Sequence, residues 1–115
     1  MIDIKDRTRA YSLRVIRLYD ALPKRGAARV IGEQLLRSAT SVGAHDREAI
    51  RSRSAAEYAA KLNAGLLELE ETLDRLELLE SAEIVTPRRL AALENETSEL
   101  TAILVTLIKN AKAKR

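Results

Sequence analysis

The sequence contains no cysteine, no tryptophan and no phenylalanine, and only one histidine. Without cysteine there is no disulfide framework and no thiolate for catalysis or metal binding. This composition suits the reducing cytoplasm, where we expect the protein to reside. Two prolines and four glycines leave little material for the turns of a β-rich fold. We therefore expect an all-α protein.

The chain also lacks any run of about 18 apolar residues, so we expect no membrane-spanning segment and no membrane partner. Apolar residues make up 46% and charged residues 32%, as in globular proteins. A length of 115 residues suffices for one continuous core. We assign residues 1–115 to a single domain.

Apolar side chains recur at intervals of three and four residues in four stretches, which is the period of amphipathic helices. The predicted helices cover about 3–22, 26–52, 54–82 and 86 to the basic tail. Because the connections are short, sequential helices should be antiparallel neighbours. The predicted fold is an antiparallel up-down-up-down four-helix bundle with long helices. The expected seam residues are Tyr11, Val15, Leu18 and Leu22; Ala28, Ile31, Leu35, Ala39, Val42 and Ala49; Ala59, Leu62, Leu66, Leu69, Leu73 and Leu76; and Leu90, Leu93, Thr97, Leu100, Leu104, Leu107 and Ala111.

Local signals place the helix ends. Pro23 cannot continue the first helix. Ser54 and Glu57 form a capping box for the third, and Thr86-Pro87 marks the start of the fourth. The stretch 38–44 has poor helix propensity, but we predict that the second helix continues through it because small side chains admit a close neighbour.

Several apolar residues lie outside a single stripe. Leu13, Ile16 and Tyr19 would widen the seam of the first helix. A single four-helix core does not need to bury all of the remaining apolar residues. These residues therefore predict an interface between copies of the chain: Leu67, Leu78, Ile103, Val105 and Ile108. Gly65, inside the third helix, is either simply tolerated or marks a close helix approach; the sequence leaves both open.

Catalytic and metal-binding patterns are missing. The single histidine, His45, has no glutamate three residues before it, so no di-iron or zinc ligand set is predicted. We find no Gly-x-Ser-x-Gly motif and no phosphate-binding glycine loop. The acids Glu68, Glu70, Glu71, Asp74 and Glu77 are interpreted as an exposed helix face. We therefore predict no enzyme activity, no catalytic residue, no metal and no cofactor.

Basic residues are unevenly distributed. Residues 1–53 carry a net charge of +6 and residues 54–115 carry −3. Arginine makes up 14 of the 20 basic residues, and its guanidinium binds phosphate with two hydrogen bonds. We predict nucleic-acid contacts, directed at phosphates rather than bases, for Arg14, Arg17, Arg29, Arg37, Arg47, Arg51 and Arg53. Alternatively these arginines are consumed by ion pairs, Arg37 with Glu33 or Arg47 and Arg51 with acids of the third helix.

A resemblance to a known family covers roughly residues 3–110. The segments that carry it are 13–19, 21–24, 30–44, 47–49, 51–54, 56–58, 61–62, 71–73 and 76–79. They resemble the four-helix-bundle proteins encoded in intervening sequences of large-subunit ribosomal RNA genes, to which the bacterial accessory proteins of diversity-generating retroelements are related. His45-Asp46 stands where the family usually has Asn-Tyr, and Asp74-Arg75 where an aromatic residue often follows Thr-Leu.

The resemblance implies a homopentameric four-helix bundle and, for the retroelement branch, binding of a reverse transcriptase and nucleic acid through a basic surface. Our leading hypothesis is a non-catalytic homo-oligomeric scaffold that binds RNA or DNA non-specifically. The alternative is a structural or protein-interaction oligomer that binds no nucleic acid.

Overall fold

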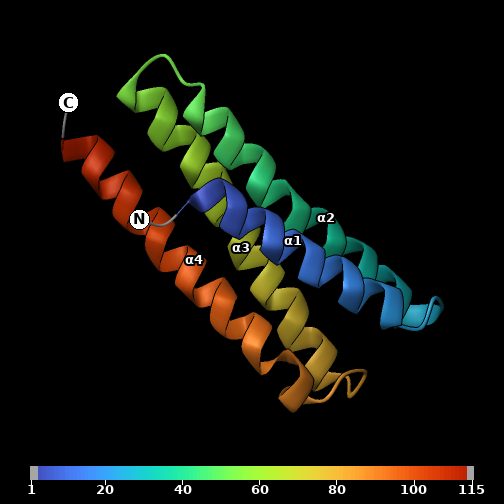
Figure 1. Cartoon of the computed structure of the whole chain (residues 1–115). Helices are drawn as coiled ribbons and strands as arrows, with labels where there is room; N and C mark the ends of the chain where they lie inside the picture. The colour runs from blue at the N-terminus through green and yellow to red at the C-terminus, as the bar shows by residue number, and fades with distance from the viewer. Residues whose placement is uncertain (1–2, 114–115) are drawn as a thin grey trace.

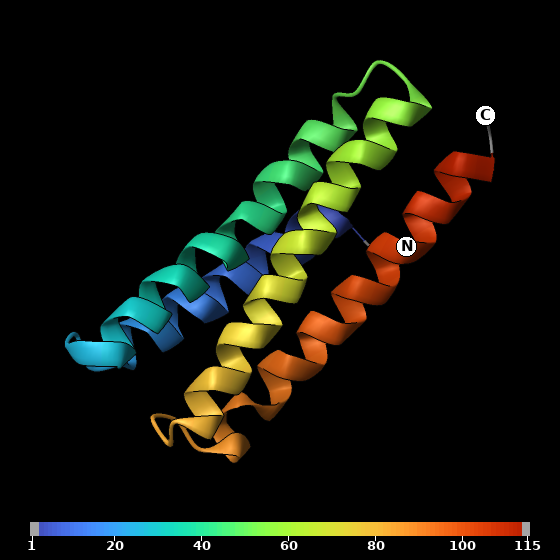
Figure 2. The same ribbon diagram turned by 180° about the vertical axis from the view of Figure 1, so that it is seen from behind.

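The computed structural model describes residues 3–113 and consists of four long helices (Figure 1). These are α1 (Ile4–Ala21), α2 (Gly26–Ile50), α3 (Ala55–Ser81) and α4 (Pro87–Ala113). Successive helices run in opposite directions, and both views show the short connections at alternating ends (Figures 1 and 2). The predicted antiparallel four-helix bundle is confirmed, and its long axis measures 47 Å.

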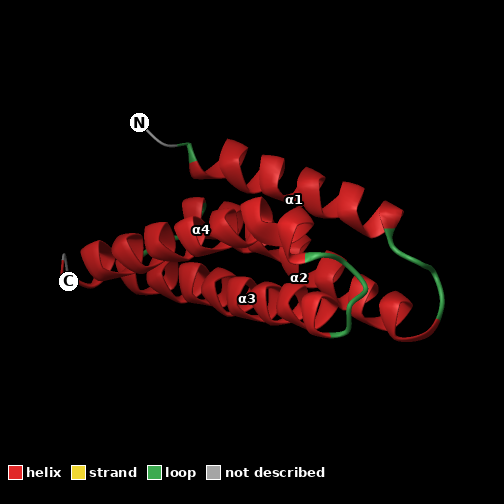
Figure 3. Cartoon of the chain, turned by 90° about the horizontal axis from the view of Figure 1, so that it is seen from below, coloured by secondary structure: helices red, strands yellow, loops and turns green. Residues whose placement is uncertain are grey.

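The helices do not contribute equally. Helix α2 packs extensively on α3, and α3 on α4. Helix α1 is shorter, lies mainly along α2 and meets α4 at few points, so it sits to one side of the other three (Figure 3). One flank of the bundle, between α1 and α4, is consequently loosely covered.

Leucine side chains from α2, α3 and α4 fill the centre of the bundle. Leu35, Leu69, Leu76, Leu100 and Leu104 are fully buried. At the end of the bundle where α2 ends and α3 begins, alanines take several of the buried positions. The predicted seams are thus confirmed in their main positions, because a 3.5-residue spacing keeps one stripe of each helix facing its neighbours.

Two parts of the predicted apolar pattern are wrong. Leu13 is 46% exposed and Ile16 is 37% exposed, so neither widens the seam of α1. Because α1 has one close neighbour, only a narrow stripe of it is covered. Ile108, counted among the apolar residues beyond a single stripe, is buried, while Leu107 beside it is half-buried.

Side-chain caps fix the starts of two helices. Asp3 Oδ1 accepts a hydrogen bond from the Lys5 amide at 3.0 Å, which starts α1. Ser54 Oγ accepts one from the Glu57 amide at 3.1 Å, as the capping box predicts for α3. Helix α2 continues unbroken through residues 38–44, as predicted.

Two buried pairs of hydroxyl groups link neighbouring helices at fixed positions along the bundle axis. Tyr11 Oη and Thr97 Oγ1 are 2.6 Å apart and link α1 to α4. Ser38 Oγ and Thr72 Oγ1 are 2.8 Å apart and link α2 to α3. Each hydroxyl is buried with a partner, so these pairs set helix register without leaving an unsatisfied group.

Gly65 marks a close approach of α3 to α2. Of the two interpretations left open by the sequence, a tolerated glycine or a close helix approach, the structure supports the second. A Cβ at this position would lie 3.1 Å from Asp46 Oδ1 and 3.5 Å from Leu104 Cδ1. The missing side chain therefore makes room for the Asp46 carboxylate.

Within residues 3–113, no helix is long and apolar enough to cross a membrane.

Candidate nucleic-acid interface

A groove with basic walls runs between the first half of α1 and the last half of α2. We call it the basic groove; it is lined by Lys5, Arg9, Arg47, Ile50 and Arg51 and encloses about 320 Å³. Lys5 and Arg9 are one helical turn apart on α1, and Arg47 and Arg51 are one turn apart on α2, so each pair shares a face. The antiparallel packing of the two helices brings the pairs together.

The groove continues along the helices because the side chains beyond it are small. This extension, of about 200 Å³, shares Lys5, Arg9 and Arg47 with the basic groove. Its remaining lining residues are Thr8, Ser12, Thr40, Gly43 and Ala44. The low-propensity stretch 38–44 thus has a structural consequence, since it leaves a trough between α1 and α2.

The cations of the basic groove are not neutralised by ion pairs among residues 3–113. No acidic side chain lines the groove or its extension. Within the described part of the chain, Lys5, Arg9, Arg47 and Arg51 make no ion pair, and all four are exposed. Four uncompensated cations around one trough produce a local positive potential that attracts polyanions.

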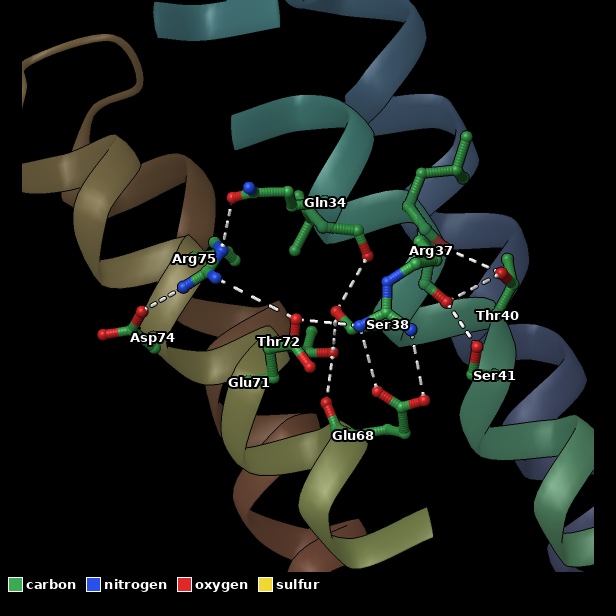
Figure 4. Close-up of polar contacts among 12 residues, drawn as sticks. Gln34, Arg37, Ser38, Thr40, Ser41, Glu68, Glu71, Thr72, Asp74 and Arg75 are labelled. Atoms are coloured by element: carbon green, nitrogen blue, oxygen red, sulfur yellow. Dashed lines mark hydrogen bonds and ion pairs between the residues drawn. The ribbon is translucent and has the colours of Figure 1, made fainter. Parts of the chain in front are cut away.

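Arg37 lies in a different setting, because its guanidinium is engaged by α3 (Figure 4). Its Nη2 donates to Glu71 Oε1 at 2.8 Å and to Glu68 Oε1 at 3.2 Å. These contacts raise the pKa of Arg37 and lower the pKa of Glu71. The pairing anticipated for Arg37 therefore exists, but with α3 acids rather than with Glu33. The expectation that Glu68 and Glu71 belong to a wholly exposed face is wrong, since both are half-buried.

The other predicted arginines are scattered. Arg29 pairs with Glu33, one turn along α2, at 3.6 Å. Arg14 is exposed on α1 and does not line the basic groove or its extension. Arg17 is exposed on α1. Arg53 is exposed in the connection between α2 and α3, at the end of the bundle that carries the groove.

Of the seven predicted residues, the structure thus gathers Arg47 and Arg51, with Arg53 near their end of the bundle. It adds Lys5 and Arg9, which the sequence analysis missed. The signal was present in their spacing, which is the same one-turn interval as that of Arg47 and Arg51. What the sequence did not reveal is that the first turns of α1 lie beside the last turns of α2.

One carboxylate behaves differently from all the others. Asp46, next to Arg47 on α2, is 1% exposed, and neither of its oxygens has a hydrogen-bond partner. Burial raises the pKa of Asp46 to about 6, opposed by the field of His45. An unpaired buried carboxylate costs free energy, and protonation relieves that cost.

His45 itself is half-buried and held by acids. Its Nδ1 is 3.0 Å from Glu48 Oε1, and its Nε2 is 3.6 Å from Glu68 Oε2. Lys61 also reaches Glu48, at 3.3 Å. In residues 3–113 no group of three or more His, Asp and Glu side chains is arranged to hold a metal ion. The histidine serves here as a link between α2 and α3.

Comparisons with known proteins place this geometry in a family. The sequence model of the 23S rRNA-intervening sequence protein matches residues 1–106. A crystal structure from Bacteroides thetaiotaomicron VPI-5482, described as a protein with unknown function from the S23 ribosomal protein family, is 34% identical with a TM-score of 0.85. The similarity covers 93% of this chain and 99% of that one. No curated protein matches this chain. The chain belongs to the 23S rRNA intervening sequence protein family.

Proposed function

We propose that the protein is a non-catalytic, homo-oligomeric scaffold that binds the phosphate backbone of RNA or DNA without reading its sequence. The observation that carries this proposal is the convergence of Lys5, Arg9, Arg47 and Arg51 on one trough without an acidic lining residue. Contacts between such cations and phosphates release counterions, which makes affinity strongly dependent on salt. No aromatic residue lines the trough, so base stacking has no platform there.

Self-association is part of the proposal and is supported by the uncovered apolar surface. The flank between α1 and α4 contains an apolar groove of about 490 Å³, lined by Ile4, Tyr58, Ala102, Ile103, Thr106 and Leu107. Residues 100–108 of α4 carry no charge. A second copy of the chain is the proposed occupant. A ring of copies would repeat the basic groove and raise avidity for a long polyanion.

Salt dependence tests nucleic-acid binding. We expect a labelled RNA or DNA duplex to bind more weakly as salt rises, and the double variant R47A/R51A to reduce the slope of log K against log salt by up to about 2. Fluorescence anisotropy at several salt concentrations measures this slope.

The matched control is R88A/R89A, which removes the same charge from two exposed arginines at the opposite end of the bundle. An equal loss in both variants would mean that net charge, not the basic groove, drives binding. Absence of binding by the unaltered protein at low salt would favour the alternative function, a structural or protein-interaction oligomer.

Assembly is tested separately. We expect light scattering to give a multiple of the 12.8 kDa chain mass, five-fold if the pentamer implied by the resemblance forms. Ile103→Glu, which places a charge in the apolar groove, should shift the particle toward the monomer. Leu13→Glu, at an exposed apolar site on α1, is the control. A monomeric unaltered protein would remove self-association from the proposal.

Binding of a reverse transcriptase, the further partner implied by the resemblance, can be tested by co-purification with the assembled particle.

A further inference from the structure

We infer that the basic groove is a two-walled seat for a single phosphodiester strand, with consecutive phosphates held between α1 and α2. This inference rests on the proposed function and specifies which part of the nucleic acid the site takes. It differs from a flat basic surface, where one helix would be enough and neighbouring arginines could substitute for one another.

The first argument is the pairing of the walls. Residues four apart on a helix are separated by about 6 Å along its axis. Phosphates of one strand follow one another at about 3.4 Å when measured along a duplex axis, and they lie farther apart in an extended single strand. Lys5 and Arg9 on α1, and Arg47 and Arg51 on α2, therefore each span roughly one to two phosphate steps. Two such walls facing one trough present cations on both sides of the same strand.

The second argument is the width of the trough. Axes of packed helices lie about 8–10 Å apart, so the trough is a surface groove over the contact between α1 and α2, and it is narrower than a double helix. The extension of about 200 Å³ continues along the helices past Gly43 and Ala44. A strand can thus continue along the trough without meeting a large side chain.

The third argument is the chemistry of the lining. Ile50, which is 59% exposed, offers an apolar surface to a sugar between the cations. Tyr19 and Tyr58 lie elsewhere, and the groove presents neither an aromatic nor an amide side chain to a base edge. The seat therefore recognises the charge and spacing of the backbone, and it accepts any base sequence.

The experiment compares the two walls. Binding of labelled oligothymidylates of 2, 4, 8 and 12 nucleotides, and of a 12-base-pair duplex, is measured by anisotropy at several salt concentrations. The variants are K5Q/R9Q for the α1 wall, R47Q/R51Q for the α2 wall, and R88Q/R89Q as the control. Circular dichroism melting confirms that each variant is folded.

For the single strand we expect each wall variant to lower the magnitude of the salt slope by about 1.4, at about 0.7 per lost phosphate contact. The control should keep the slope of the unaltered protein. The duplex, too wide to enter, should depend less on the α1 wall than the single strand does.

Two failures are distinguishable. If the unaltered protein binds neither oligonucleotides nor duplex at low salt, the proposed function falls, and this inference with it. If it binds but K5Q/R9Q leaves the single-strand slope unchanged, only the two-walled seat is overturned. Equal dependence of the duplex on both walls would also overturn it, since a double helix would then be the occupant.

Discussion

Replacing Asp46 by Asn is expected to stabilise the protein at pH 7.5 by about 1–2 kcal/mol. The substitution keeps the size of the side chain but removes a charge that is 1% exposed and has no hydrogen-bond partner on either oxygen. Each unit of pKa shift corresponds to about 1.4 kcal/mol, and the remaining unpaired amide offsets part of the gain. Urea unfolding at fixed pH measures the difference.

The pH dependence of this difference identifies its cause. In the folded state the pKa of Asp46 is raised from 3.8 to about 6. Both states are protonated below about pH 3.8, where the charge costs nothing. As pH rises toward 6 the unfolded state releases its proton first, so the stability contributed by this residue falls and then levels off. The advantage of D46N should therefore grow between about pH 4 and pH 6.5 and stay constant above.

His45 is the titratable neighbour that acts on Asp46, and its field already opposes the rise of the Asp46 pKa. The other groups around Asp46 do not complicate this test. Helix α4 has no titratable residue between 100 and 108, the region opposite Gly65. On α3, Lys61 pairs with Glu48, and Glu68 pairs with Arg37. The lowered pKa values of Glu48, Glu71 and Glu96 make the whole protein lose stability in acid, but this trend is common to both variants and cancels in the difference. D20N, at an exposed site on α1, is the control. An advantage of D46N that is independent of pH would contradict ionisation as its cause.

Asp46 also shows where sequence reasoning about the fold stopped. Position 46 follows Val42 by four residues and precedes Ala49 by three, so the spacing that predicts the seam of α2 places it in the core. A carboxylate at such a position conflicts with burial. The structure resolves the conflict through Gly65, whose missing side chain accommodates the carboxylate. Such a compensation lies on another helix, and apolar periodicity contains no information about it.

The candidate site was predictable to a smaller extent than the fold. Apolar spacing located the four helices because burial depends on one repeating stripe, which can be read from a single sequence. Whether an arginine is free depends on the neighbouring helix. Arg37 and Arg47 looked alike in the sequence, yet Arg37 faces Glu68 and Glu71 whereas Arg47 faces Lys5 and Arg9 across a trough.

Tyr11→Ala is expected to destabilise the protein by about 3–5 kcal/mol and to loosen α1. Tyr11 is the largest fully buried side chain of a helix that buries few residues, the others being Thr8 and Val15. Its removal leaves a cavity and ends the 2.6 Å contact with Thr97. Tyr11→Phe keeps the ring and should cost about 0.5–1.5 kcal/mol, the net value of one hydrogen bond. Urea unfolding and hydrogen exchange of the α1 amides measure both effects.

The same pair of variants connects stability with function. With Tyr11 removed, Arg7 still binds α4, through Glu96 at 2.8 Å and Glu99 at 2.7 Å, but these bonds are partly exposed and hold less strongly than a buried ring. Lys5 and Arg9 belong to α1, so a loosened α1 displaces one wall of the basic groove. Tyr11→Ala should therefore reduce the salt slope for a single strand as K5Q/R9Q does, although it removes no charge, while Tyr11→Phe should preserve it. If Tyr11→Ala speeds exchange of the α1 amides yet leaves the slope intact, then α1 does not help to position the bound strand, and the arginines of α2 suffice.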